Sequence, residues 1–283
     1  MIKKYLIPAL FVAVALLYAS CDKVEADANG YYIYYSGAIG DWVDGPAIAD
    51  HSPHVLLEKY TGVRCLNCPD GDAVIHAAMN TYGSALIPIS IHDSSSFTRP
   101  YGSDQRLSTP VGNTWSRYFG ISSYPTAICN RTEMGGTLQF NPAAGVSAAV
   151  EAALSQPVMM ALAASMERDG NHYAVTVSLE YLQDYPNPLT VTLLLLEDSV
   201  RATQLQPDGR TKATAYLHCH LLREAITNPW GADVDADGHK GTKRQARFTH
   251  TSTNPLVNHS HCYIVAFVSD KNTRQILAAT ECR

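Results

Sequence analysis

The sequence has little positive charge and no basic cluster. Its 21 lysine and arginine residues are outnumbered by 26 aspartate and glutamate residues, and the formal net charge is −5 with histidine neutral. Proteins that bind nucleic acid through its phosphates carry a basic patch or stripe. The charge pattern therefore argues against nucleic acid as a partner.

An apolar run long enough to span a membrane is also missing. The N-terminal run, residues 5–20, is shorter than the about 20 residues that a spanning helix needs. Two lysines precede it and small residues end it before Cys21, which is typical of a secretory signal with a lipobox-like end. We predict a lipoprotein signal peptide at 1–20, with ordinary secretory cleavage as the alternative. Lipidated Cys21 would anchor a tether and N-terminal extension at 21–50.

A second CxxC motif and an HxxxH pair are both absent. The single CxxC, Cys65 and Cys68, lies in "YTGVRCLNCPDG". A structural zinc site would need two more ligands at suitable spacing, so zinc is the weakest interpretation. A redox-active dithiol and a structural disulfide both remain open.

The first half of the chain alternates strands with helices. The apolar segment Val55–Tyr60 predicts a strand, and helical spacing after the CxxC predicts a helix with Pro69 near its start and Gly83 as its stop. The further predicted elements are a strand over 85–92, a short helix capped by Asn113, strands over 124–129 and 137–140, and a helix over 142–156.

After residue 157 the helical period disappears. Apolar segments separated by turn signals such as "RDGN" and "QPDG" predict short strands, which together favour a β-sandwich. These segments are 159–167, 171–182, 189–197, 212–222, 245–252, 261–269 and 275–282.

The order of elements in the first half resembles a thioredoxin-like domain, which has a CxxC between its first strand and the following helix. In that fold a cis-proline faces the dithiol at the start of the third strand. Pro125 in "SYPTAI" stands at this place. The two signals are far apart in sequence and would meet in space, so together they are more specific than the CxxC alone.

Residues 50–283 also resemble one family of outer-membrane lipoproteins of Bacteroidetes, the twenty-eight-kilodalton outer membrane protein type. The segments that carry the resemblance are "VLLEKYTGVRCLNCPDG", "YPTAICNR", "LLEDSVRATQ" and "YLHCHLLREAITNPWG". It implies an α/β thioredoxin-like domain at 51–156 followed by an all-β immunoglobulin-like sandwich at 157–283. It also implies a protein anchored by lipid to the cell outer membrane and exposed at the surface, where members have been discussed as antigens or adhesins.

The residues around the CxxC permit a specific redox mechanism. Cys65 precedes a helix whose dipole favours thiolate, and Arg64 adds a neighbouring cation. Cys65 would attack a substrate disulfide, Cys68 would resolve the mixed disulfide, and Pro125 would shape the substrate groove. The sequence departs from typical thioredoxins because the pair between the cysteines is Leu–Asn rather than Gly–Pro and no tryptophan precedes the motif. Glu58 is only an approximate counterpart of the buried thioredoxin carboxylate.

Two functional hypotheses therefore remain. The first is thiol–disulfide exchange on exported proteins by Cys65 and Cys68, as an oxidoreductase. The second is a surface adhesin, receptor or binding protein for an extracellular ligand, in which Cys65–Cys68 is a structural disulfide. Neither hypothesis requires a cofactor.

The other cysteines suggest one more bridge. Cys262 and Cys282 are equidistant from Asn272, so a symmetric hairpin would place them opposite each other. We predict a Cys262–Cys282 disulfide, with Cys219–Cys262 as the competitor. Cys129 and the remaining Cys219 would be buried thiols.

Two weaker metal patterns lie in the second half. Asp233, Asp235 and Asp237 occupy positions one, three and five of a calcium-like loop, but Arg244 stands where a bidentate glutamate is required. The pair His218 and His220 has the spacing of one strand face, and "HSHC" at 259–262 repeats it. A metal or haem site would need these strands to be adjacent, and structural or surface histidines are the interpretation that we favour.

Overall fold

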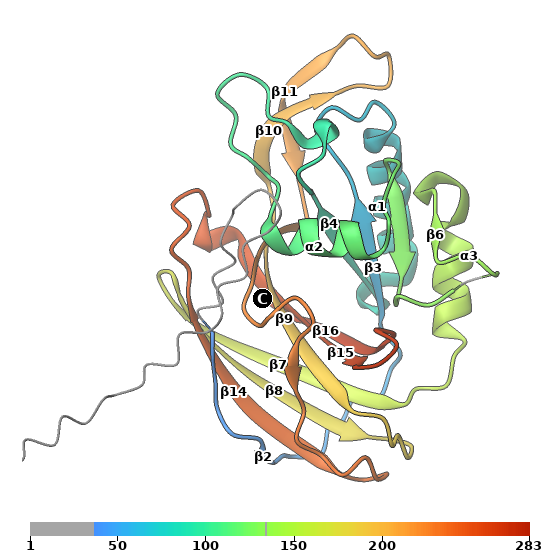
Figure 1. The fold of residues 1–283 in the computed structure, drawn as a ribbon, viewed down its shortest axis with the longest axis vertical. Coiled ribbons are helices and arrows are strands. Elements are labelled where there is room, and N and C mark those ends of the chain that lie inside the picture. Colours follow the sequence, from blue (N-terminus) through green and yellow to red (C-terminus); the bar gives the residue numbers. More distant parts are fainter. Residues whose placement is uncertain (1–36, 134) are drawn as a thin grey trace, which may run out of the picture.

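The computed structural model describes residues 37–133 and 135–283. The signal peptide predicted at 1–20, the lipidation predicted at Cys21 and part of the extension predicted at 21–50 lie outside the described residues. Within these ranges the chain is a mixed α/β protein with large sheets and few helices (Figure 1). No helix among the described residues has the length and apolar character needed to cross a bilayer.

The largest sheet, called the main sheet below, combines strands from both halves of the chain. Its order in the described residues is β16–β15–β9–β12–β4–β3–β5–β6, with β13 paired to β9. The halves meet where β12 runs parallel to β4, and there the Ser90 N–H donates to the His220 carbonyl (2.7 Å). The strands are β3 (Val55–Tyr60), β4 (Leu86–Ile91), β5 (Thr126–Cys129), β6 (Gln139–Phe140), β9 (Leu189–Glu197), β12 (Leu221–Ala225), β13 (Ala232–Asp233), β15 (Cys262–Asp270) and β16 (Ile276–Cys282).

A second sheet, a hairpin and the helices complete the described fold. The second sheet has the order β1–β14–β8–β7, with β2 paired to β14, and the hairpin pairs β10 with β11. Its strands and those of the hairpin are β1 (Ala38–Ile39), β2 (Val43–Asp44), β7 (Met160–Asp169), β8 (His172–Tyr181), β14 (Lys243–Thr251), β10 (Val200–Leu205) and β11 (Lys212–His218). The helices are α1 (Cys68–Tyr82), α2 (Pro110–Tyr118), α3 (Pro142–Leu154) and the short 3₁₀ turns η1 (Gly83–Ala85), η2 (Ser96–Thr98) and η3 (His259–His261).

Strand β9 shows why the main sheet is buried on both faces. All of its residues are buried, and its sequence up to Leu196 is a continuous apolar and threonine run, as expected for a strand covered on two sides. Leu193 and Leu195 pack into the core shared with the second sheet, whereas Leu194 and Leu196 pack into the core that contains Trp115 of α2. The period of two along a strand produces this division.

The elements of the first half follow the sequence prediction closely. Strand β3 has the predicted bounds, and α1 ends before Gly83, whose positive φ of 58° suits a glycine. The predicted cap of α2 was wrong. The helix begins at Pro110, and the Thr109 side chain accepts the Gly112 N–H, so Asn113 lies inside the helix.

The segment predicted as one strand over 212–222 is broken in two. His220 adopts a positive φ of 55°, and its N–H donates to the Asp198 carboxylate. The residues before the break pair with β10 in the hairpin, whereas the residues after it enter the main sheet between β9 and β4. Strand β10, which the sequence did not indicate, exists as the partner of β11.

The predicted Cys262–Cys282 disulfide is not formed, and neither is its competitor Cys219–Cys262, because all three are free thiols. Cys282 lies opposite Ile264, two residues out of the predicted register. The turn is displaced because the Asp270 carboxylate accepts the N–H groups of Asn272 and Thr273, and the ladder shifts at Ser269.

Candidate functional site

Cys65 and Cys68 form a disulfide at the N-terminus of α1, with their Cα atoms 5.4 Å apart. Pro69 occupies the first turn of the helix, where its missing N–H costs nothing. Both cysteines are buried, with exposed fractions of 2% for Cys65 and 0% for Cys68. Solvent therefore reaches almost none of the disulfide.

The peptide bond between Tyr124 and Pro125 is cis. A Cβ placed on Gly71 of α1 would lie 3.1 Å from Pro125 Cγ, so the proline packs against the first turns of the helix that carries the disulfide. Tyr124 packs its ring on Phe97, with the ring centroids 5.2 Å apart. The structure thus brings Pro125 to the helix that begins with Cys68.

Two segments cover residues 63–68, called the cysteine loop below. From β10, Gln204 Nε2 donates to the Cys65 carbonyl (3.0 Å) and the Leu205 N–H donates to the Val63 carbonyl (2.9 Å). From η2, the Phe97 carbonyl accepts the Arg64 N–H (2.8 Å). The Arg64 guanidinium is held by the carbonyl groups that follow η2 and lies 4.1 Å over the Tyr101 ring. The loop is therefore fixed from both sides.

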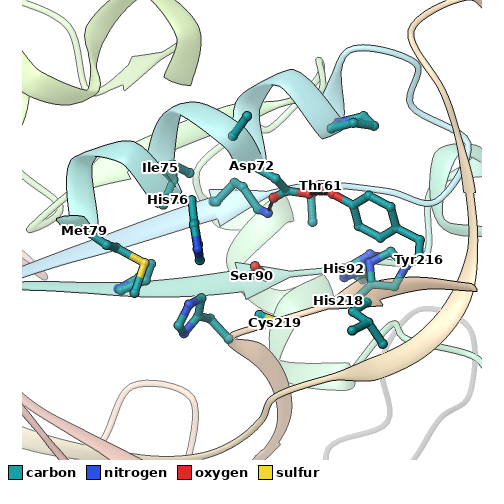
Figure 2. A pocket seen from close by; sticks show the side chains of 16 residues that line it. Thr61, Asp72, Ile75, His76, Met79, Ser90, His92, Tyr216, His218 and Cys219 are labelled. Carbon is teal, nitrogen blue, oxygen red and sulfur yellow. Dashed lines mark hydrogen bonds and ion pairs between the residues drawn. The ribbon is translucent and has the colours of Figure 1, made fainter.

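A cavity of about 340 Å³ lies between α1, β3, β4 and the break after β11, and is called the histidine pocket below. Its buried floor is formed by Lys59, Thr61, Ser90, His92 and His218. The exposed side chains of Ala73, His76 and Leu217 lie at its rim, with half-buried Cys219 and His220 between. Figure 2 shows His76 and Met79 reaching down from α1, Asp72 directed toward Tyr216, and His92 close to His218.

Lys59 is the buried cation of the pocket. Its ammonium contacts the Asp72 carboxylate, which also accepts a hydrogen bond from the Tyr216 hydroxyl (2.7 Å). Burial lowers the pKa of Lys59 to about 7, whereas the nearby Cys219 acts in the opposite direction. The ion pair with Asp72 likewise favours the charged form.

Three histidines of the pocket, His92, His218 and His220, are neutral at pH 7. Burial lowers the pKa of His218 to about 4 and that of His220 to about 4, and it holds the pKa of His92 well below its usual range. Lys59 adds to the lowering at all three. His220 Nδ1 is 2.8 Å from the Tyr263 hydroxyl. Neither ring nitrogen of His92, nor Nε2 of His218, has a hydrogen-bond partner.

Glu58 does not take the place of the thioredoxin carboxylate near the disulfide. Adjacent strand residues point to opposite faces, so Lys59 faces α1 while Glu58 faces the core beneath α2. There Arg131 holds Glu58 through two hydrogen bonds, Nε to Oε2 (2.9 Å) and a terminal nitrogen to Oε1 (2.7 Å).

The sequence predictions did not include three residues of the histidine pocket, Lys59, Asp72 and His92. The available signal was the lysine within the apolar strand "VLLEKY".

The three aspartates of the calcium-like loop are engaged by other side chains. Asp233 pairs with Lys271 (2.6 Å), Asp235 pairs with Arg244 (3.3 Å), and Asp237 accepts the Thr242 hydroxyl (2.6 Å). Arg244, which stands at position twelve of the loop, supplies positive charge where a calcium loop needs a carboxylate. Among the described residues no group of three or more histidine, cysteine, aspartate or glutamate side chains could hold a metal ion.

The two histidine pairs do not join. His218 and His220 line the histidine pocket. His259 and His261 form η3, where His259 Nδ1 lies 2.7 Å from the Tyr173 hydroxyl. The two pairs therefore lie on different elements, and among the described residues they do not form a shared metal or haem site.

Comparisons with known proteins identify one family. The model of the family described as "Outer membrane protein Omp28" matches residues 112–281. No curated protein matches the chain.

Solved structures resemble this one at low sequence identity. HBP35 of Porphyromonas gingivalis has a TM-score of 0.64 at 18% identity, covering 81% of this chain and 74% of its own. Protein AGR_C_4864 from Agrobacterium tumefaciens has a TM-score of 0.50 at 13% identity, covering 82% and 95%. A domain of the outer membrane lipoprotein Omp28 from Porphyromonas gingivalis has a TM-score of 0.31 at 21% identity, covering 44% and 86%. At these identities the likeness to HBP35 concerns the fold alone.

Proposed function

We propose that this chain, which belongs to the Omp28 family of outer membrane proteins, is a binding protein that takes a small ligand in the histidine pocket and carries Cys65–Cys68 as a structural disulfide. The protein is located at the outer membrane. In this proposal Cys21 is lipidated and the protein faces the cell exterior.

The burial of the disulfide is the observation that supports a structural role for Cys65–Cys68. Exchange requires a thiolate to reach one of the two sulfurs. Cys65 and Cys68 are 2% and 0% exposed, and hydrogen bonds from Gln204 and to Phe97 hold the cover in place. Cross-linking a short loop of this kind stabilises the fold by about 2 kcal/mol in the chain-entropy account.

The domain organisation is part of the same proposal. Residues 51–156 form a thioredoxin-like domain, which the cis Tyr124–Pro125 bond beside α1 supports. Residues 157–283 form an immunoglobulin-like sandwich, which the packing of β9 and β15 on the second sheet supports. The two domains share one sheet through β4 and β12.

Thiol–disulfide exchange on exported proteins is the second candidate. Pro125 lies against the helix that carries the disulfide, and the side chains of Leu66 and Phe97 are each 42% exposed beside the cysteine loop. Such apolar side chains would contact a substrate peptide if the cover opened.

A trapping experiment separates the two candidates. Cys68→Ser leaves Cys65 as the attacking thiol and removes the resolving thiol, so an exchange enzyme would accumulate mixed disulfides in cells. We expect no Cys65-dependent partner, because the sulfur is covered. Cys65→Ser is the matched control, since it leaves the buried Cys68. Partners captured by Cys68→Ser and not by Cys65→Ser would overturn the structural role.

A further inference from the structure

His218 lines the histidine pocket and has one ring nitrogen without a hydrogen-bond partner. The Ala202 carbonyl holds its ring through a hydrogen bond, and Nε2 is the nitrogen that has no partner. A carbonyl can only accept, so Nδ1 carries the proton and Nε2 is an acceptor. The side chain is almost fully buried, with 6% of the residue exposed. A group that enters the pocket and donates a hydrogen bond would satisfy this nitrogen.

His92 provides the complementary group beside it. The residue is 1% exposed, both ring nitrogens lack a partner, and its ring lies edge-on to that of His218 with the centroids 5.7 Å apart. A neutral imidazole has one donor and one acceptor nitrogen. The pocket floor therefore offers a donor and acceptors within one small area. Buried polar groups are normally paired, so two such rings together indicate a place for a ligand.

The charge of the floor is already balanced. Asp72 compensates Lys59 and is itself bound by Tyr216, and the imidazoles of His92, His218 and His220 are neutral because burial lowers their pKa. An ion that entered would lose its hydration without gaining a free counter-charge. The floor therefore favours an uncharged group.

The walls and the volume of the pocket indicate the polarity and the size of the rest of the ligand. Ile75, Met79, Pro88 and Leu217 are apolar parts of the lining. A cavity of about 340 Å³ lies within the range of small-molecule pockets. From these features, and resting on the proposed ligand-binding function, we infer that the histidine pocket binds a small, uncharged, largely apolar molecule. Its hydroxyl or amide N–H donates to His218 Nε2 while its oxygen accepts from His92.

The test uses the full chain and three uncharged probes, phenol, benzyl alcohol and benzamide, with benzoate and benzylamine as charged counterparts of the same ring. Zn²⁺ alone is a further probe, since Cys219 and His76 also line the pocket. Ligand-observed NMR measures binding, and ¹⁵N spectra of the imidazoles report the His218 Nε2 shift. We expect the uncharged probes to bind and to shift this nitrogen.

Two substitutions locate the binding. His218→Leu removes the acceptor and should weaken the uncharged probes at least tenfold. Ala73→Trp, at the exposed rim of the pocket on α1, should block entry without disturbing the floor. Ala77→Trp is the matched control, because Ala77 is exposed on the same helix and does not line the pocket.

The outcomes distinguish a failure of the inferred ligand class from a failure of the proposed ligand-binding function. Binding of the uncharged probes that is lost in Ala73→Trp and kept in Ala77→Trp supports both. If benzoate, benzylamine or Zn²⁺ binds there instead, the inferred ligand class is wrong and ligand binding stands. If no probe of any class binds, both are overturned.

Discussion

Replacing Arg131 by methionine is expected to lower the free energy of unfolding by about 3–5 kcal/mol, because it leaves a buried carboxylate without its partner. The side chains of Arg131 and Glu58 are each 1% exposed, and their two hydrogen bonds fix the carboxylate from both oxygens. The guanidinium also lies 4.4 Å over the Trp115 ring. Methionine is unbranched like arginine, so the positive φ of 51° at this position affects both residues alike.

Urea unfolding of purified protein measures this loss. Arg247→Met is the control, since Arg247 is 53% exposed and its partner Glu167 is 77% exposed, and surface pairs contribute less than about 1 kcal/mol. The double variant Glu58→Met/Arg131→Met should recover much of the stability, because no unpaired charge remains. A loss at Arg131 as small as that at Arg247 would mean that the pair is not buried as described.

In the wild-type protein we expect the free energy of unfolding to increase between pH 7 and pH 9 because of Lys59, and we expect Lys59→Met to abolish this increase. The pKa of Lys59 in the folded protein, about 7, lies below its ordinary value of 10.5. Between these values the unfolded chain holds more protons than the folded one, so stability increases as the pH rises. From pH 7 to pH 9 this group alone should add about 2 kcal/mol to the free energy of unfolding. That contribution is complete above the unfolded pKa and is lost as the pH falls toward 7.

The comparison between variants isolates this group. Burial lowers the pKa values of His92, His218 and His220, so these groups titrate below this interval. The free energy of unfolding is measured for both proteins at several pH values. The value for wild type minus the value for Lys59→Met should increase with pH. Lys271→Met is the control, since Lys271 is 45% exposed and pairs with an exposed aspartate. A flat difference curve would contradict the burial of Lys59.

Local patterns predicted the first half of the fold well. The strand Val55–Tyr60, helix α1 and the approach of Pro125 to that helix are each specified by short signals: an apolar run, a proline start with a glycine stop, and a resemblance. The cap of α2 was missed because Thr109 and Asn113 both suit a helix start, and Pro110 in the first turn decided between them.

Pairing between strands far apart in the sequence determined the features that local sequence patterns did not predict. The segment 212–222 has the composition of one strand, but its two parts find different partners, and the break at His220 builds one wall of the histidine pocket. The Cys262–Cys282 prediction assumed a symmetric turn, and the Asp270 hydrogen bonds shifted the register by two residues. A single position along β3 separates Glu58, on the α2 side, from Lys59 in the pocket.

The most direct test of the structural role of the disulfide is its reduction potential in the folded protein. The full chain would be equilibrated across a dithiothreitol redox series, alkylated, and the Cys65–Cys68 peptide read by mass spectrometry. A sealed structural disulfide predicts a potential below about −300 mV. A potential between roughly −270 and −120 mV, the range of thioredoxin and its oxidising relatives, would contradict the account.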